Sequence, residues 1–404
     1  MTERTETQWI APGIAPGACS ACGSLNTGPF VSAPGVPAHV CSYWPTAEQA
    51  LACARGDLHL QFCADCGFIE NTAFDEKTAE YTGAYENSLH FSEFFQGYIA
   101  DFADQILERH TTDGGVLEIG CGNGEFLELL CEKGGGGGVG FDPAYDPNEP
   151  LTKLDGRLKF YRDYYTRQYE DVDARLIVCR QVLEHIPQPA QFLKGLRETV
   201  GDREGTATII EVPNFYYALE NLNFWDIVYE HPNYFSPPTL ARLFSHSGFD
   251  VSGAWETYAR QFIAIDASPS TSERGEVPAD LKDLSALPAL IERFSKEFAK
   301  TIARWNEKLA AVKAAGERIV VWGAGARGVT FLNLADSERT IEYVVDINHR
   351  KHNQYVVGTG QRVVPPSFLE DYRPDHVIIM NPIYKEEITR DLSNMGLSPQ
   401  ILEG

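Results

Sequence analysis

Short apolar runs alternate with stretches of helical spacing through the middle of the chain, and this pattern restricts its fold more than any other feature. The alternation favours a mainly parallel sheet covered by helices. Just before it, apolar side chains at helical spacing predict a helix within 91–110. We therefore expect an α/β domain over 76–266. The expected strands are 116–120, 138–142, 158–163, 175–180, 207–213 and one near 260.

A second, weaker alternation of strands and helices follows residue 317. A linker-like segment at 267–280 and a long helical stretch at roughly 286–315 precede it. At 404 residues the chain is too long for one ordinary core. We expect four parts: a module over 1–75, the α/β domain over 76–266, a linker and helix over 267–316, and a Rossmann-like α/β domain over 317–404.

Composition restricts the classes of partner and the compartment. The formal net charge is −23, and so acidic a surface repels phosphate backbones, which argues against nucleic-acid binding. No apolar run approaches the length of a bilayer span, and the first residues lack a charged-then-apolar signal pattern. We expect a cytoplasmic protein with no membrane partner. In a reducing compartment its nine cysteines are then metal ligands, core thiols or nucleophiles, not disulfides.

The segment 19–75 contains six of the nine cysteines and few periodic apolar stretches. Such a segment buries little core, so we expect a metal to hold it together. Cys19 and Cys22 form one CxxC turn, Cys63 and Cys66 form another, and each turn is followed by glycine. Two such turns place four thiolates for a tetrahedral structural zinc ion. A redox-active CxxC is the alternative.

The segment VLEIGCGNGEF (116–126) joins a buried strand to a helix through Gly120, Gly122 and Gly124. Glycines let the backbone turn tightly and approach a ligand, while the N–H groups of the helix face it. Glu118 lies within the strand, and Asp142 closes the next one. A carboxylate there can accept hydrogen bonds from both ribose hydroxyls of an adenosyl group. Asp163 ends the third strand, within reach of an adenine edge.

Together these features resemble the class I methyltransferases that use S-adenosylmethionine (SAM). The resemblance implies a Rossmann-like core with SAM as cofactor. It also implies cofactor contacts from residues that follow the strands: Pro143, Tyr164 and Gln181. Binding of NAD is the main alternative, because dinucleotide folds use related glycine spacings. A glycine-rich turn without a ligand is the other.

Two histidine-containing segments follow the fourth and fifth strands, at the carboxyl edge where ligands of open α/β sheets bind. The first, RQVLEHIP (180–187), contains His185. The second, 211–237, is aromatic and polar, and it includes the run Tyr229, Glu230 and His231. Histidine suits proton abstraction, an adjacent carboxylate can orient it, and a tyrosine hydroxyl can stabilise an enolate oxygen. A packed cap over the sheet is the alternative.

Two further segments suggest ligand contacts. The segment 80–92 precedes the first helix of the α/β domain and is placed to cover the cofactor, with simple packing as an even alternative. Its candidate residues are Tyr81, Tyr85, Ser88 and His90. Near the C-terminus, Gly323, Gly325 and Gly328 follow a strand, and Asp346 ends the next. Alone this indicates a dinucleotide site.

Chains with two cofactor-binding glycine loops are rare. The C-terminal domain is therefore interpreted as a degenerate nucleotide-binding domain that binds the nucleotide of a substrate. Arg327, Arg350 and Lys351 are then the candidates for phosphate contacts. A purely structural α/β domain is the alternative.

The order of these three parts resembles the sugar C-methyltransferases that act on nucleotide-linked 4-keto deoxysugars. The resemblance covers nearly the whole chain. It rests on the EVPN…EHPNYFS stretch and on VVDINHRKHNQYVVGTGQRVVPP (344–366). It implies a nucleotide-sugar substrate whose ketone acidifies the neighbouring ring carbon.

In that family a histidine removes the proton and the carbon attacks the SAM methyl group. Carried onto this chain, His231 is the base, Glu230 its partner, and His185 and Tyr85 further catalytic residues. Asn214 and Tyr234, from the same stretch, are expected to contact the substrate. The family reads Tyr-His-Glu-His, but here Val228 stands at the tyrosine position. Either Tyr229 takes over the hydroxyl's role or the enolate chemistry is lost.

Three functions stay open. The first is C-methylation of a nucleotide-linked ketone or a related small molecule. The second is O- or N-methylation of another metabolite, which needs positioning and a base for a hydroxyl. The third is a non-catalytic protein that binds SAM or a nucleotide sugar. The density of titratable residues over 181–236 argues against the third.

Overall fold

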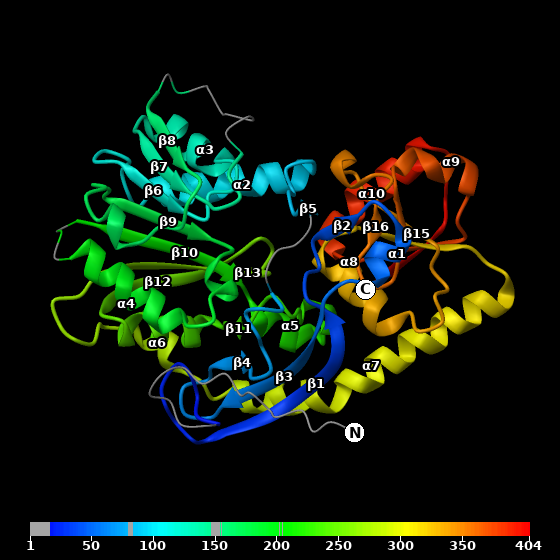
Figure 1. Cartoon of the computed structure of the whole chain (residues 1–404), viewed down its shortest axis with the longest axis horizontal. Helices are drawn as coiled ribbons and strands as arrows, with labels where there is room; N and C mark the ends of the chain where they lie inside the picture. Colours follow the sequence, from blue (N-terminus) through cyan, green and yellow to red (C-terminus); the bar gives the residue numbers. More distant parts are fainter. Residues whose placement is uncertain (1–16, 80–83, 147–153, 155, 202, 204) are drawn as a thin grey trace.

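The computed structural model describes residues 17–79, 84–146, 154, 156–201, 203 and 205–404. Figure 1 shows two lobes, with the sheet of β6 to β10 on one side and that of β15 and β16 on the other. Strands β1 and β3 and helix α7 connect the lobes along one side (Figure 1). No helix in the described part of the chain is long and apolar enough to cross a bilayer.

The central domain is a seven-stranded sheet in the order β12-β13-β10-β9-β6-β7-β8. The five strands from β10 to β8 are parallel, and β13 and β12 add antiparallel at one edge. Its strands are β6 (Val116–Ile119), β7 (Gly138–Phe141), β8 (Leu158–Tyr161), β9 (Leu176–Arg180), β10 (Ala207–Pro213), β12 (Phe249–Thr257) and β13 (Phe262–Pro269). Its helices are α2 (Glu93–Leu107), α3 (Glu125–Gly134), α4 (Pro189–Val200), α5 (Phe215–Asn221) and α6 (Pro237–His246).

Helices cover both faces of this sheet because successive strand residues point to opposite sides. Val116 packs with α2 and α3, whereas Leu117 packs with α4 and α6. The same split separates Ile209 from Ile210 in β10. The near-continuous apolar runs of the sequence therefore become strands that are buried on both faces, which confirms the expected α/β class.

The C-terminal domain is built on an eight-stranded sheet in the order β19-β18-β14-β15-β17-β16-β2-β5. Its strands are β14 (Ile319–Trp322), β15 (Tyr343–Val345), β16 (Tyr355–Val356), β17 (Arg362–Val364), β18 (His376–Ile379), β19 (Gln400–Glu403), β2 (Ser42–Trp44) and β5 (Ala84–Tyr85). Its helices are α1 (Ala47–Leu51), α8 (Ala326–Ala335), α9 (Leu369–Tyr372) and α10 (Lys385–Asn394). Short 3-10 helices complete the chain: η1 (Arg167–Tyr169), η2 (Leu183–His185), η3 (Phe224–Asp226), η4 (Ala279–Lys282), η5 (His349–Lys351), η6 (Pro366–Phe368) and η7 (Pro382–Tyr384).

The expected boundary at residue 75 does not match the sheets. Strands β2 and β5 extend the C-terminal sheet, because β2 pairs with both β16 and β5. A four-stranded sheet joins β1 (Thr27–Pro37), β3 (Arg55–Cys63) and β4 (Ile69–Asn71) to β11 (Asn233–Tyr234) of the central domain. The N-terminal segment thus shares a sheet with each of the other two domains.

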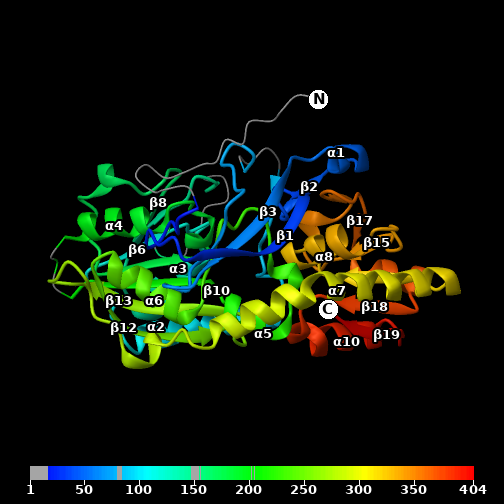
Figure 2. The same ribbon diagram turned by 90° about the horizontal axis from the view of Figure 1, so that it is seen from below.

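The expectation that 19–75 buries little core is also wrong. Leu58, Leu60 and Phe62 alternate along β3 and pack under α5 and α7 (Leu287–Ala315). The alternation LHLQF, typical of a half-buried strand, is visible in the sequence. Helix α7 begins against this sheet and ends against α8 of the C-terminal domain, so it lies along both lobes (Figure 2).

Candidate active site and metal centre

The loop between β6 and α3 has a backbone that favours glycine. Gly120, Gly122 and Gly124 have φ of 74°, 55° and 94°, which L-residues with a Cβ rarely adopt. A Cβ on Gly124 would lie 2.2 Å from the Phe160 ring, whereas one on Gly122 would meet nothing within 4 Å. The loop is therefore packed behind Gly124 and open at Gly122, where a ligand has access to the N-terminus of α3.

The carboxylates after β7 and β8 are held by hydrogen bonds. Asp142 accepts from the Gly122 N–H at 2.8 Å and from the Ala144 N–H at 2.7 Å. Asp163 accepts from the Tyr169 hydroxyl and the Tyr164 N–H, which hold the pKa of its carboxyl below the ordinary value. Pro143 and Tyr164 are exposed beside them. The structure thus brings the expected ribose carboxylate onto the open glycine of the loop.

Glu118 and Gln181 flank the loop from β6 and β9. Glu118 is buried, and burial raises its pKa to about 8. Its Oε2 has no hydrogen-bond partner among the described residues. Gln181 is a non-glycine residue with φ of 55°, and its N–H donates to the Glu211 carbonyl at 2.8 Å. Strain and an unsatisfied carboxylate oxygen gather at ligand sites, so these residues fit an adenosyl cofactor with an amino-acid end.

Two histidines meet where η2 follows β9. The rings of His185 and His231 lie edge to face with centroids 4.6 Å apart. His185 Nδ1 lies 2.9 Å from the Glu230 carbonyl oxygen. Because a carbonyl only accepts, Nδ1 carries the proton and the neutral ring keeps its lone pair on Nε2. Burial lowers the pKa of both rings, that of His231 well below its ordinary value. Two neutral imidazoles therefore stand together at the carboxyl edge of the sheet.

Glu230 contacts different groups from those expected. Its Oε1 accepts from the Val40 N–H at 2.9 Å, and its Oε2 lies 3.8 Å from His39 Nδ1. Its link to the histidine pair is its backbone carbonyl, which binds His185. No sequence pattern marks His39, because only the fold carries the segment between β1 and β2 to this site.

Glu184 also lies beside the histidine pair. Its carboxylate and one ring nitrogen of each histidine lie within 4.8 Å of one another. Burial raises the pKa of Glu184 to about 8, so the side chain is mainly neutral at pH 7. The group therefore presents little negative charge to the two imidazoles.

The expected catalytic hydroxyls are placed elsewhere. The Tyr229 ring packs 5.4 Å from Phe74 in the space above Gly56, and its hydroxyl accepts from the Asp75 N–H at 2.8 Å. The structure thus separates Tyr229 from His231, because the large ring fills the core between β3 and α5. The Tyr234 hydroxyl donates to the Val228 carbonyl at 2.9 Å.

The other residues expected to contact ligands near this site have the following positions and partners. Asn214 caps α5, and its amide donates to Glu256 and to the Arg260 carbonyl. Tyr85 lies on the edge strand β5, opposite Ser42. Tyr81 lies outside the described residues. His90 interacts electrostatically with Glu125 at the start of α3, which agrees with a segment that covers the glycine loop.

The second glycine loop, after β14, is occupied by the protein's own side chains. Asp346 accepts from the Ala324 N–H at 2.8 Å and from buried Lys351 at 3.2 Å. Tyr43, from β2, donates its hydroxyl to the Ala324 carbonyl. Asp346 thus differs from Asp142, which accepts from two backbone N–H groups, in being ion-paired with a buried lysine.

The expected phosphate contacts of this domain are ion-paired. Arg327 binds Asp226 through two nitrogens at 2.6 and 3.0 Å. Arg350 pairs with Glu86 at 3.4 Å and keeps an exposed side chain. Gly323 has φ of 112°, and Gly325 caps α8. Of these residues, Arg350 is the one whose charge stays accessible.

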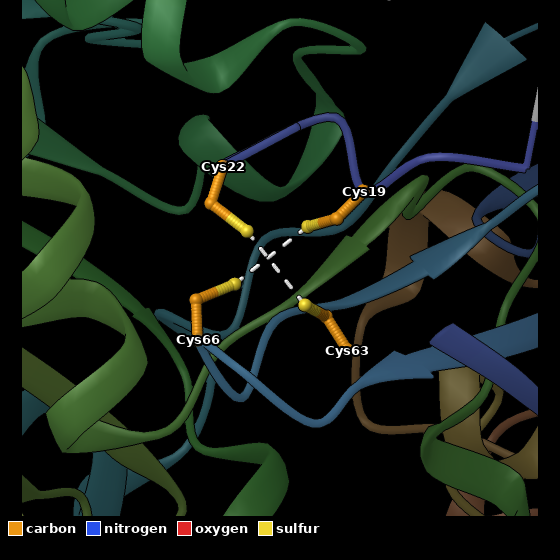
Figure 3. Close-up of side chains that lie close together, drawn as sticks. All are labelled: Cys19, Cys22, Cys63 and Cys66. Carbon is orange, nitrogen blue, oxygen red and sulfur yellow. Dashed lines mark hydrogen bonds between the residues drawn. The ribbon is translucent and has the colours of Figure 1, made fainter. Parts of the chain in front are cut away.

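The four cysteines of the CxxC turns converge, as Figure 3 shows. The sulfur atoms of Cys19 and Cys66 lie 3.6 Å apart, and those of Cys22 and Cys63 lie 3.7 Å apart. A tetrahedron of thiolates about 2.3 Å from zinc has edges of about 3.8 Å. The Gly23 and Gly67 N–H groups bond back to the first cysteine carbonyl of each turn, both at 2.8 Å. The arrangement fits a zinc ion.

Comparison with known proteins agrees with this geometry. A protein-family model described as a methyltransferase domain matches residues 91–252, and a second family model, described as a C-methyltransferase C-terminal domain, matches residues 276–397. The C-methyltransferase NovU from Streptomyces niveus is 27% identical over 308 residues, 72% of this chain and 72% of that protein.

Two further similarities cover a smaller share of the chain. The ubiquinone biosynthesis O-methyltransferase of Yersinia enterocolitica is 31% identical over 109 residues, 24% of this chain and 43% of that protein. Among solved structures, the riboflavin-derivative dimethyltransferase RosA from Streptomyces davawensis covers 44% of this chain and 55% of that chain, with 22% identity and a TM-score of 0.36.

The two matched models together span most of the chain, and the first of them contains the open glycine loop and the carboxylate bound to it. The protein is therefore a SAM-dependent methyltransferase with the domain composition of the C-methyltransferases.

Proposed function

We propose that the protein transfers the SAM methyl group to the carbon beside the ketone of a nucleotide-linked deoxysugar. The observation that carries the proposal is the neutral His185–His231 pair at the carboxyl edge of the cofactor sheet. The C-methyltransferase C-terminal domain and the similarity to NovU support carbon as the acceptor atom.

Carbon methylation needs a base, because a C–H bond beside a ketone is only weakly acidic. Bound SAM supplies an electrophilic methyl group on a sulfonium ion. His231 is proposed to take the proton from the ring carbon, and a depressed pKa keeps its nitrogen free at neutral pH. His185, oriented by the Glu230 carbonyl, fixes the ring of His231 edge to face.

The enolate oxygen needs a hydrogen-bond donor other than the tyrosine that the sugar C-methyltransferases have at this position. Val228 has no hydroxyl, and those of Tyr229 and Tyr234 are engaged with backbone groups. Because the single N–H of neutral His185 is bonded to the Glu230 carbonyl, we propose that a ring N–H of His39, which lies beside Glu230, takes that role. Cys19, Cys22, Cys63 and Cys66 are proposed to bind a structural zinc ion.

Oxygen methylation is the second candidate, because a stretch of 109 residues is similar to an O-methyltransferase and His231 can equally deprotonate a hydroxyl. Hydrogen exchange separates the two. The protein is incubated in D₂O with S-adenosylhomocysteine and a nucleoside-diphosphate-linked 4-keto deoxysugar, and NMR follows deuterium at the carbon beside the ketone.

Enzyme-dependent exchange that His231→Ala abolishes is the expected result. Methyl transfer from SAM to oxygen without such exchange would replace this proposal with the second candidate. Binding of nucleotide sugar and SAM with neither exchange nor transfer would indicate a binding protein and overturn both.

A further inference from the structure

We propose that Arg180 binds the α-carboxylate of the methionine part of SAM. The inference rests on the cofactor and is independent of the methylated acceptor. Arg180 is the last residue of β9, and the parallel register that pairs Cys179 with Ile119 brings it beside Gly120, where the cofactor loop begins.

The guanidinium lies at the start of α3. Its Cζ is 4.2 Å from the centroid of Phe126, which belongs to the first turn of that helix, and 5.7 Å from that of Phe102. Stacking on these two aromatic rings holds the planar guanidinium against α2 and α3, beside the glycine loop. The charge therefore lies beside the loop that binds the cofactor.

A buried network holds the guanidinium from one side. Arg180 Nε donates to Glu211 Oε2 at 3.2 Å, and the Glu211 side chain is fully buried. Glu211 Oε1 also accepts from the Thr257 hydroxyl at 2.9 Å and from the Tyr98 hydroxyl. These bonds fix the plane of the guanidinium through Nε alone.

The two Nη groups of Arg180 make no hydrogen bond to any residue that the structure describes, and neither is a buried unsatisfied atom. The side chain is 12% exposed, so these donors have access to a ligand. A guanidinium fork with its outer nitrogens open matches a carboxylate, which can accept two parallel N–H bonds. The neighbouring Glu118, mainly neutral at pH 7, does not compete strongly for it.

The distances fit the length of SAM. In the sheet order β9-β6-β7, Arg180 ends one neighbour of β6 and Asp142 follows the other. Adjacent strands lie about 4.8 Å apart, so the backbones of these two residues are about 10 Å apart. That is about the separation between the ribose hydroxyls and the α-carboxylate of an extended adenosyl-methionine. Ribose on Asp142 and carboxylate on Arg180 then place the sulfonium above the glycine loop.

Two ligands that differ only in the amino-acid end test the proposal. S-adenosylhomocysteine carries the α-carboxylate, whereas 5′-methylthioadenosine keeps the adenosyl thioether and lacks it. In calorimetric titrations, Arg180→Gln is expected to weaken S-adenosylhomocysteine binding by about ten- to a hundredfold, the size of a lost charge-assisted hydrogen-bonded contact. Binding of methylthioadenosine should change less than about twofold.

Two further variants serve as controls for this experiment. Arg197→Gln is the matched control, because Arg197 is partly buried in the same domain and its bonds to the Gly248 and Ser270 carbonyls lie outside the cofactor loop. It should leave both affinities unchanged. If Arg180→Gln unfolds because Glu211 stays buried without a partner, Arg180→Gln/Glu211→Gln removes both charges and should show the same selective loss.

An equal loss of both ligands would show that Arg180 only supports the fold of the site and would overturn the proposal. Unchanged binding of S-adenosylhomocysteine would overturn it too. If the unaltered protein bound neither ligand, the cofactor assignment itself would fail, and the two failures are thereby distinguished.

Discussion

At the scale of single residues, the environment of each titratable group decides its role. His185 and His231 are neutral because burial removes water that would stabilise the charged ring. Glu118 and Glu184 are largely protonated at pH 7 for the same reason, since burial raises the pKa of each to about 8. Arg180 keeps its charge because it faces Glu211.

Replacement of the proposed base tests the reaction most directly. His231→Ala is expected to lower kcat by about 10²- to 10⁴-fold, the usual contribution of a positioned base, with little change in S-adenosylhomocysteine affinity. Methyl transfer from radiolabelled SAM and calorimetry measure the two quantities. His376→Ala, in the C-terminal sheet, is the control. A variant with normal kcat would remove His231 from the mechanism.

The depressed histidine pKa values also set the direction of the pH dependence. The folded state favours neutral His231, so activity should stay level as pH falls to about 6.5 and decline only as pH falls through the lowered pKa. Below about 6.5 the unfolded chain binds protons that folded His185 and His231 do not. The contribution of these two histidines to the free energy of unfolding should therefore decrease as pH falls through that window, whereas buried Glu118 and Glu184, with pKa values of about 8, contribute in the opposite direction. The kcat/KM profile between pH 4 and 8 tests the activity, and urea unfolding of the unaltered protein against His231→Ala over the same range isolates the histidine contribution. An acidic limb centred above 6.5 would contradict the prediction.

At the scale of elements, the loops that follow the strands contain most of the proposed ligand contacts, and the strands hold them in register. The β6–α3 loop opens at Gly122 because Gly124 is packed on Phe160. Asp142 reaches that loop because β7 is the parallel neighbour of β6. The CxxC turns are also held by local backbone bonds. The N–H of the glycine that follows each turn donates to the carbonyl of the first cysteine in that turn.

Loss of the ribose carboxylate should weaken the adenosyl ligands. Asp142→Ala removes the proposed acceptor for the two ribose hydroxyls and the observed acceptor of the Gly122 N–H. We expect about a hundredfold loss of affinity for S-adenosylhomocysteine and for methylthioadenosine alike, because both carry ribose. Asp146→Ala, on the same loop, serves as the control. An affinity within about threefold of the unaltered protein would mean that Asp142 does not hold ribose.

Disruption of the cysteine cluster should remove a metal and loosen the turns. Cys63→Ser is expected to lower bound zinc from ~1 ion per chain towards none and to reduce the midpoint of thermal unfolding. Elemental analysis and calorimetry measure both. Cys53→Ser, outside the cluster, should change neither. Undiminished zinc in Cys63→Ser would refute this ligand set.

At the scale of the whole molecule, the N-terminal segment ties the two lobes together. Its strand β2 extends the C-terminal sheet, its strand β4 pairs with β11 of the central domain, and Val40, between β1 and β2, donates its N–H to Glu230. Cys19, Cys63 and Cys66 pack in the core of the central domain. The cysteine cluster, the proposed base and both sheets are thus parts of one connected structure.

A substitution that disrupts the packing of β2 should therefore destabilise the C-terminal domain. Tyr43 is buried there, so Tyr43→Ala is expected to cost about 3–5 kcal/mol and to raise hydrogen exchange in β16 and β17. Exchange followed by mass spectrometry locates the effect. Tyr161→Ala, on the exposed edge strand β8, should leave those strands protected. Unchanged protection in Tyr43→Ala would mean that the C-terminal sheet is stable without β2.

Local patterns in the sequence were enough to predict the central fold, the glycine loop, Asp142 and the two CxxC turns, because each depends on residues close together in the chain. The alternation in β3 was also present in the sequence, but the cysteines drew the interpretation towards a metal-held segment without a core. The sharing of sheets between domains left no local signal, since an edge strand such as β2 is defined by its partner.

Tertiary structure alone decided the environment of the candidate base. His39 and Glu230 are 191 residues apart and meet only through the fold. Tyr229 is adjacent to Glu230 yet faces another core, because Gly56 leaves space for its ring. The sequence by itself determined which chemical groups stand at the ends of the strands. Packing between distant segments decided which of them face one another, because burial and hydrogen-bond partners are properties of the assembled core.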